Sequence, residues 1–437
     1  MEDQPAHSLH GCPVEVCHLI FSCLSRADLR TLCFVHGNLH AVAEPLLYSN
    51  IHFTWEKRSQ PHPITSLLRS LLDRPQLATY VSKLSLVGGP FRNPWLRQRA
   101  PTILVSEDDL EGPVKFVTKT TISYNETWAH ELRNGTMDVF VAVLVSQSLR
   151  LTSLVIEGDI CWETKFLGLV LQSMICAPNT DDDDYGLRLD LRHLETVSLQ
   201  GPAQDYQFYN NARNTADVLP IFYLPSLKRA SVSIDNPIAF SWPTINAPCS
   251  LGLRDLKLEL IREPFLGQVL STMDQLQSLD WRWYYEEDVY DERYYTRIVD
   301  LTEITQSLSH VRETLTELAI SAMHQDPPDP LPLFFQGSMK GISEFKKLTK
   351  LTVPITFLMG AWSVDWTRRI ESSLPMSLES LTITDDLCYN NLFEWTGPDV
   401  YSLLERWLKS YQTSTPHLCD VKVVLNKCTK TWITIKG

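Results

Sequence analysis

The chain has 437 residues, of which 44% are hydrophobic and 21% are charged, and its formal net charge is −13. This composition is typical of a folded protein, and the length exceeds that of one ordinary compact domain unless the chain is an elongated repeat array. The negative charge argues against a general nucleic-acid binder, because such proteins neutralise phosphates with an excess of Lys and Arg.

The sequence shows no targeting or membrane-spanning segment. Its first residues, Met-Glu-Asp-Gln-Pro, have neither a basic nor an apolar run, so we expect no signal peptide. The most apolar stretch, Met137–Leu149, is short and carries Asp138 and Gln147, which predicts a core helix and no membrane partner. Ten cysteines without paired spacing indicate reduced thiols in the cytoplasm or the nucleus.

Residues 9–51 predict three short helices. Pro13 suits a first helical turn, and Glu15 suits the positive end of that helix. Ser25 is placed to cap a second helix, and a third segment ends near Pro45. Apolar residues recur at helical spacing in the first two helices, namely Val16, Ile20, Phe21, Leu24, Leu29, Leu32, Cys33 and Val35. Three helices of this size make a marginal core, so we expect the module to gain stability from a partner or from the following domain.

The order of these residues, continued by Glu44-Pro-Leu-Leu-Tyr48, resembles an F-box. An F-box is a small helical module that docks its owner onto the Skp-family adaptor of cullin–RING ubiquitin ligases. The extension ending at Tyr48 is similar to that of many fungal F-box proteins. Three usual positions differ, since Cys12 and Cys17 replace leucines and Leu39 replaces a late aromatic residue. All three replacements are small or apolar, so we expect weaker adaptor binding at worst.

The resemblance assigns adaptor contact to the matching positions. They are Pro13, Glu15, Val16, Ile20, Phe21, Leu24, Leu29, Leu32 and Val35. The same region is rich in cysteine and histidine, which raises the alternative of a zinc site. The residues concerned are Cys12, Cys17, His18, Cys23, Cys33, His36 and His40. They contain no C-x₂-C pair, so their spacing favours cysteines acting as small apolar core residues over a metal site.

From residue 77 onward a short phrase recurs, in which an apolar residue is followed three positions later by Leu-x-Leu or its equivalent. The clear copies begin at Leu151, Leu194, Leu253, Leu276, Leu315, Leu348 and Leu378, and weaker copies lie at Leu84, Val232 and Val421. Leu-x-Leu predicts a short strand with alternate residues buried, and the earlier leucine is expected to pack beneath it. This phrase resembles the leucine-rich repeat. The resemblance implies an α/β fold, an irregular solenoid with a parallel sheet and outer helices.

Other segments fill the intervals between copies. The amphipathic stretches Ile64–Leu72 and Val400–Leu408 predict helices. The largest insertion covers about residues 90–136, and within it Val114–Ile122 alternates like an edge strand. Residues 181–184 and 326–332 are rich in Asp or Pro and predict solvated loops. We expect two domains, the adaptor-binding helices at 1–52 and the solenoid at 53–437.

Target recognition is expected on the strand residues that flank the buried leucines. They are Glu157, Gln200, Asp235, Lys257, Glu259, Asp280, Arg282 and Glu317, and their acidic bias suits a protein target with a basic segment. The alternative is a solvated sheet face without a partner. A second candidate is the aromatic run that starts at Trp281, because Trp and Tyr dominate interaction hot spots. Its candidate residues are Arg282, Trp283, Tyr284, Tyr285 and Tyr290, although aromatic residues also serve to pack an insertion onto its own protein.

The sequence lacks motifs for catalysis or for a cofactor. It has no G-x-S-x-G elbow, phosphate-binding glycine loop or H-E-x-x-H helix, so we expect a non-catalytic protein without cofactor or metal. We interpret it as the substrate-recognition subunit of an SCF-type cullin–RING ubiquitin ligase, which would hold the cullin and RING subunits through the adaptor. The first alternative is a binding scaffold that does not deliver ubiquitin. The second is a hydrolase or transferase with an active site assembled from distant residues.

Overall fold

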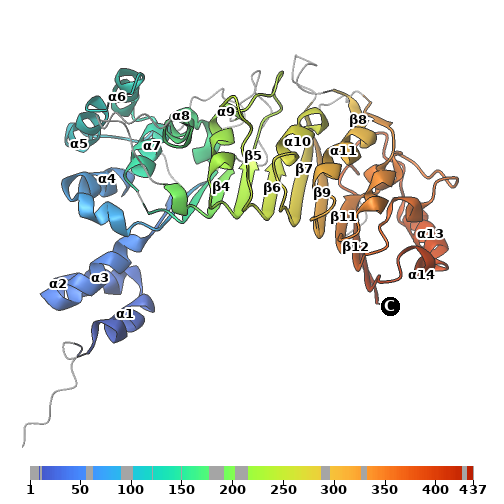
Figure 1. Ribbon diagram of the computed structural model, residues 1–437, viewed down its shortest axis with the longest axis horizontal. Coiled ribbons are helices and arrows are strands. Elements are labelled where there is room, and N and C mark those ends of the chain that lie inside the picture. Colours follow the sequence, from blue (N-terminus) through green and yellow to red (C-terminus); the bar gives the residue numbers. More distant parts are fainter. Residues whose placement is uncertain are drawn as a thin grey trace, which may run out of the picture. The chain divides into compact units, whose positions relative to one another are not determined.

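A computed structural model describes most of the chain (Figure 1). The described residues are 9, 12–55, 63–89, 102–120, 122–148, 150–176, 191–201, 215–286, 296–325, 332–425 and 431–436. They fall into two compact units. Unit 1 comprises Met1–Phe91, Arg99–Trp162 and Ala177–Leu194, and unit 2 comprises Arg92–Gln98, Glu163–Cys176 and Glu195–Gly437. The predicted loop at 181–184 lies outside the described residues, as do residues 326–331 of the predicted loop at 326–332.

Unit 1 begins with the three predicted helices. They are α1 (Val14–Ser22), α2 (Arg26–Val35) and α3 (Gly37–Ser49). The predicted cap of the second helix is confirmed, because the Asp28 backbone N–H donates to the Ser25 Oγ at 3.2 Å. The core of these helices is small and consists of Cys17, Phe21, Leu29, Leu39 and Ala43. We call residues 12–49 the three-helix module.

The three-helix module continues into the first strand without a linker. Helix α3 ends at Ser49, and β1 (Asn50–Trp55) begins at the next residue. Glu44 on α3 accepts from the Arg74 guanidinium at 2.7 Å, and Arg74 precedes the short helix η2 (Pro75–Tyr80). Strand β1 pairs in parallel with β2 (Lys83–Gly88), which pairs in parallel with β3 (Ser153–Gly158). The module is therefore joined to the first repeats both through the backbone and through an ion pair.

The insertion in unit 1 is helical, so the edge strand predicted at Val114–Ile122 is wrong. Its described part contains α5 (Glu107–Thr118) and α6 (Asn125–Arg133), it follows α4 (Pro63–Asp73) and β2, and α7 (Met137–Gln147) comes directly after it. The Ser106 Oγ caps α5 by accepting from the Asp109 N–H, and the first turn of α5 is acidic. These start signals outweigh an alternation of only a few residues. The predicted core helix is confirmed, since α7 is buried along almost its whole length.

Unit 2 is a row of parallel strands. They are β4 (Thr196–Gln200), β5 (Arg229–Ser233), β6 (Asp255–Glu259), β7 (Ser278–Glu286), β9 (Glu317–Gln325), β11 (Lys350–Pro354), β12 (Ser380–Thr384) and β13 (Asp420–Leu425). Strand β14 (Thr431–Lys436) pairs with β13 in the antiparallel direction. A separate parallel pair joins β8 (Ile298–Asp300) to β10 (Phe334–Gln336).

Helices connect the strands of unit 2 and lie on one side of its sheet (Figure 1). The α-helices are α8 (Lys165–Ile175), α9 (Thr215–Val218), α10 (Glu263–Leu270), α11 (Leu301–Leu308), α12 (Ile355–Met359), α13 (Gly397–Leu408) and α14 (Tyr411–Ser414). The 3₁₀ helices are η5 (Leu219–Tyr223), η6 (Ser309–Val311), η7 (Met339–Glu344) and η8 (Ile370–Ser373), while η3 (Asp159–Trp162) and η4 (Leu191–His193) belong to unit 1. We call the side of the unit 2 sheet away from these helices its open face.

The repeating phrase predicts this architecture correctly. Each of its ten copies, from Leu84 to Val421, falls in a strand of the structure. In the copy at β6, for example, Leu253, Leu256 and Leu258 are all buried. The amphipathic stretches that begin at Ile64 and Val400 form helices α4 and α13. Among the described residues, no helix has the length and apolar character needed to cross a membrane.

Candidate binding surfaces

The three-helix module exposes more apolar side chain than its size requires. On α1, Val16, Leu19 and Ile20 are 41%, 69% and 41% exposed. At the end of α2, Phe34 and Val35 are 80% and 59% exposed. Single exposed apolar residues are ordinary, but several on two short helices make a candidate surface for protein contact. We call these five residues the apolar surface of the three-helix module.

The structure places the predicted adaptor-contact residues in two groups. Pro13, Glu15, Val16, Ile20 and Val35 are exposed, and Leu24 and Leu32 are half-buried. Phe21 and Leu29 lie in the core of the module, which corrects their assignment, since a buried side chain holds the helices together and cannot reach a partner. Sequence reasoning missed Leu19 and Phe34, because it followed only the stripe that faces the core.

The open face of unit 2 carries four charged residues at its centre. Lys257 and Glu259 lie on β6, and Asp280 and Arg282 lie on β7. The strand register places Lys257 beside Asp280 and Glu259 beside Arg282. Their neighbours in the same rows are small, namely Ser231 and Ser233 on β5 and Ala319 and Ser321 on β9. We call these four charged residues the charged quartet.

Within the charged quartet, Glu259 receives both cations. Its Oε1 lies 3.1 Å from the Arg282 Nη1 and 3.4 Å from the Lys257 Nζ, and the Ser233 Oγ donates to its Oε2 at 3.2 Å. Glu259 is only 3% exposed, so the structure corrects its assignment as a target-binding residue. A carboxylate that is buried and holds three donors serves to order strands β5, β6 and β7.

Asp280 is the member of the charged quartet that is left over. Its carboxylate makes no hydrogen bond or ion pair with any residue that the structure describes, although its side chain is half-buried. Burial raises the pKa of Asp280, and this effect outweighs the attraction of Lys257 and Arg282; Glu259 raises the pKa further. Asp280 therefore has acceptor capacity that the fold does not use.

The remaining residues of the predicted strip do not form one cluster. Glu157 is half-buried at the end of β3 in unit 1, whereas Gln200 and Asp235 are half-buried in unit 2, at the end of β4 and after β5. The Nε2 of Gln200 is buried and has no hydrogen-bond partner among the described residues. Glu317, at the start of β9, pairs with Lys350. Of the whole strip, only the residues on β6 and β7 meet as a group.

The aromatic run at the end of β7 is buried, which corrects the expectation that it contacts a target. Trp283, Tyr284 and Tyr285 are 0%, 2% and 3% exposed. Trp283 stacks on Tyr285 with 6.3 Å between ring centroids and meets Phe357 of α12 edge-to-face. These rings pack β7 onto its own unit, which is the alternative reading of the sequence. The predicted residue Tyr290 lies outside the described residues.

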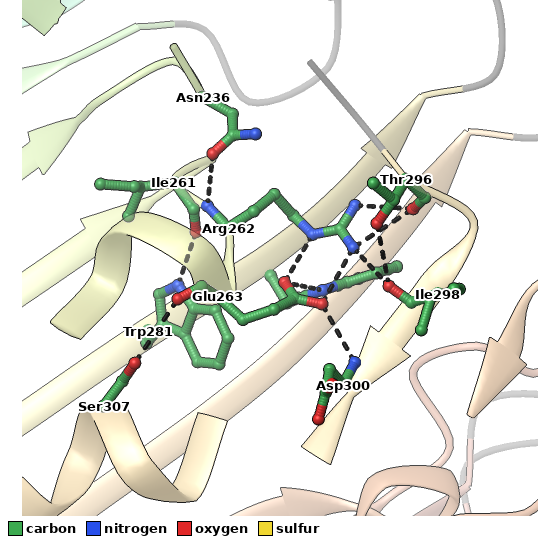
Figure 2. A network of polar contacts seen from close by, with 10 residues as sticks. Asn236, Ile261, Arg262, Glu263, Trp281, Thr296, Ile298, Asp300 and Ser307 are labelled. Atoms are coloured by element: carbon green, nitrogen blue, oxygen red, sulfur yellow. Dashed lines mark hydrogen bonds and ion pairs between the residues drawn. The ribbon is translucent and has the colours of Figure 1, made fainter. Parts of the chain in front are cut away.

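A buried ion pair fixes β7 from the helix side of the sheet, as Figure 2 shows. Arg262 and Glu263, at the start of α10, are 1% and 2% exposed and bind each other through two contacts of 2.7 and 3.0 Å. The Trp283 Nε1 donates to the Glu263 Oε2 at 3.2 Å, and the Asp300 N–H donates to the Oε1 at 3.2 Å. A buried charge is tolerated only when it is paired and hydrogen-bonded, and both conditions are met here.

Arg262 extends the same network to the residues around the start of β8. Its guanidinium donates to the carbonyl oxygens of Thr296 and Ile298 and lies over the Trp283 ring, 4.5 Å from the centroid. Leu260, just before this pair, adopts a positive φ of 77°, a strained backbone conformation for a branched side chain. These contacts connect Trp283 of β7 with the start of β8, and Figure 2 shows the Arg262–Glu263 pair with Thr296, Ile298 and Asp300 around it.

Comparison with known proteins identifies the repeat region. Residues 56–437 match a family model described as a leucine-rich repeat domain. No curated protein matches the chain. The family match begins after the three-helix module, so the resemblance of residues 9–51 to an F-box stays a prediction. Among the described residues, no group of three or more His, Cys, Asp or Glu side chains is arranged to hold a metal ion.

Proposed function

The chain belongs to the leucine-rich repeat family, and from this premise we propose that it is a target-recognition subunit of an SCF-type cullin–RING ubiquitin ligase. In this role the three-helix module binds the Skp-family adaptor, and through it the cullin and RING subunits. The repeats bind a protein target, and ubiquitin transfer takes place on other subunits. The chain itself supplies no catalytic group, cofactor or metal, and it acts in the cytoplasm or the nucleus.

The observation that carries this proposal is the apolar surface of the three-helix module. Leu19, Phe34 and Val35 are each more than half exposed, although burying them would stabilise a module whose core is so small. Removing apolar area from water is the main driving force of most protein association. The sequence of the same helices resembles an F-box, so an adaptor of the Skp family is the partner that fits both observations.

Attachment of the module to the repeats supports a role in delivery. Helix α3 runs into β1 without a linker, and the Glu44–Arg74 ion pair joins α3 to the residue before η2. The first repeats would therefore be held in a fixed relation to the adaptor. Holding two reactants in a fixed geometry is a large part of what an enzyme complex contributes to the rate. A flexible linker would contribute much less.

The test is co-purification of the full chain with a Skp-type adaptor after co-expression. We expect a stoichiometric complex with the wild type and loss of at least about 100-fold in affinity for Leu19→Asp, because a charge at an apolar contact is left unpaired on binding. Leu251→Asp is the matched control, since Leu251 is 63% exposed in unit 2 and Leu19 is 69% exposed. A folded wild type that forms no complex, or a complex that tolerates Leu19→Asp, contradicts the proposal.

The second candidate is a leucine-rich repeat scaffold that binds the adaptor and a target but does not deliver ubiquitin. The family match favours it as far as protein binding goes, since repeats of this kind are binding surfaces. Reconstitution with the adaptor, cullin, RING and conjugating enzymes separates the two functions. Ubiquitin chains on a bound target that disappear with Leu19→Asp support the ligase subunit, and a bound target that stays unmodified supports the scaffold.

A further inference from the structure

We propose that Asp280 is the residue through which the open face of unit 2 binds a lysine or arginine side chain on an extended segment of the target. This inference rests on the proposed function of target recognition and names the chemistry of that site. It follows from three properties of the charged quartet: how its charges are paired, what surrounds Asp280, and how firmly β7 is held.

The pairing of charges shows which ligand charge the open face accepts. Lys257 and Arg282 both bind Glu259, which also accepts from Ser233, so both cations are already paired with a carboxylate. Asp280 accepts from no described residue. Asp386, which follows β12, is a further carboxylate close enough to Arg282 for the two charges to interact. Glu259 and Asp386 are thus enough to balance the two cations of the quartet. The carboxylate of Asp280 remains as an acceptor, and the ligand group that complements it is a cation.

Neighbours of Asp280 leave its carboxylate open to a ligand. The row that crosses the sheet at Asp280 runs from Ser231 through Lys257 to Asp280, Ala319 and Thr352. The residue on the β9 side is thus an alanine, whose methyl group cannot cover a carboxylate or donate to it. A half-buried carboxylate with a small neighbour forms stronger ionic contacts than an exposed one, because less water competes for it.

Strand β7 presents Asp280 on a rigid support. Trp281 and Trp283 point from the other side of the same strand into the core, and each donates through its indole N–H, to the Ile261 carbonyl oxygen at 2.9 Å and to Glu263 at 3.2 Å. The Arg262–Glu263 pair completes that support (Figure 2). A binding residue that is held in place loses little conformational entropy when its ligand arrives.

An extended target segment fits this surface better than a folded domain does. Beside the charged quartet, the positions of β5 and β9 on the open face carry small side chains, Ser231, Ser233, Ala319 and Ser321, which leave a basic side chain room to reach the sheet. Arginine can bind a carboxylate through two parallel hydrogen bonds, whereas lysine binds as a point charge. We therefore expect arginine to be preferred over lysine at the anchoring position.

The test uses a phage-displayed library of random 12-residue peptides as the probe and the full chain as bait. We expect selected peptides to be enriched in Arg and Lys, and their affinity to fall about tenfold or more with Asp280→Asn, the cost of losing a hydrogen bond to a charged group. Asp274→Asn is the matched control, since Asp274 is an exposed carboxylate in the turn before β7. Asp280→Glu keeps the charge and should retain part of the affinity.

Three results would overturn the inference: no enriched peptide, enrichment without basic residues, or equal binding by Asp280→Asn. Thermal unfolding of each variant shows that any lost affinity does not come from a lost fold. Adaptor co-purification is measured on the same preparations, and it depends on the three-helix module alone. If the chain binds the adaptor but selects no basic peptides, the role of Asp280 is rejected and the proposed function stands. If it selects basic peptides through Asp280 but does not bind the adaptor, the ligase role is rejected and a peptide-binding repeat surface remains.

Discussion

The three-helix module and unit 2 leave different chemical groups unsatisfied. In the module, Leu19 and Phe34 remain exposed although the core contains few side chains. In unit 2 the repeat leucines are buried, and within the charged quartet Glu259 binds both cations, so that Asp280 has no ion pair with a described residue. Apolar side chains that are not buried, and polar groups that are not paired within the fold, remain available for a partner. The module offers apolar area, and the repeats offer a negative charge.

The largest expected effect tests whether the buried polar groups of unit 2 stabilise its fold. Glu263→Gln removes the charge that balances Arg262 while keeping the shape of the side chain. We expect it to lower the free energy of unfolding by about 3–5 kcal/mol, because Arg262 is then a buried and uncompensated cation. Urea denaturation followed by tryptophan fluorescence measures the change, since Trp281 and Trp283 lie in this network.

A control for that experiment comes from the surface of the same unit. Glu405 and Lys409 form an ion pair on α13 with both side chains largely exposed. Glu405→Gln should change the free energy of unfolding by no more than about 0.5 kcal/mol, because exposed pairs contribute little. Equal effects of Glu263→Gln and Glu405→Gln would mean that the Arg262–Glu263 network does not hold β7 in place.

The second effect separates the core of the module from its apolar surface. Phe21 is fully buried, and Phe21→Ala should cost about 3–5 kcal/mol, enough to unfold a module of this size. Phe34 is 80% exposed, and Phe34→Ala should change stability by no more than about 0.5 kcal/mol. Hydrogen exchange measures both effects. We expect the amides of α1–α3 to lose protection in Phe21→Ala and to keep it in Phe34→Ala, while protection in β6–β12 stays unchanged in both variants.

If Phe34→Ala reduced the protection of α1–α3 as Phe21→Ala does, Phe34 would belong to the core, and the apolar surface would not be a partner site.

The comparison between the two phenylalanines also shows what a sequence pattern leaves open. Both residues are apolar and lie in short helices, and helical spacing selects Phe21 for the inner face correctly. It does not reveal that Phe34 is 80% exposed, because that depends on how the helices pack.

The repeats were predictable because most of their strands carry the same local leucine pattern. A leucine followed three residues later by Leu-x-Leu fixes which residues point inward, and the ten copies fall in ten strands. Strand β1 has no such leucine pair and escaped notice, as did the helix at Glu107–Thr118, although Ser106 and the acidic turn after it were visible signals. The pattern also missed that Trp283, Tyr284 and Tyr285 are all buried, because alternation describes one strand and not what covers its two faces.

Binding roles were harder to predict than strands, for a physical reason. The sequence showed Glu259 and Asp280 as two carboxylates on the same face of two strands that were expected to be neighbours. Which of them is free depends on where the Lys257 and Arg282 side chains go, and that is decided by contacts across strands. Glu259, the favoured residue, turned out to be fully occupied, and Asp280 is the one with capacity to bind.

The smallest expected effect is also the sharpest test of that distinction. The pKa of Asp280 is raised above its ordinary value of 3.8, with burial as the first cause, Lys257 and Arg282 opposing it and Glu259 adding to it. Between 3.8 and the raised pKa the folded state binds more protons than the unfolded state, so stability contributed by this group falls as pH rises through that window. Asp280→Asn removes the penalty and should make the protein slightly more stable than the wild type at pH 7, with the gap closing towards pH 4. Urea denaturation of both proteins from pH 4 to pH 7 measures it, and a variant that is less stable at pH 7 would show that Asp280 is needed by the fold. A residue whose removal strengthens the fold and weakens peptide binding is retained for binding, because stability alone would have selected against its charge.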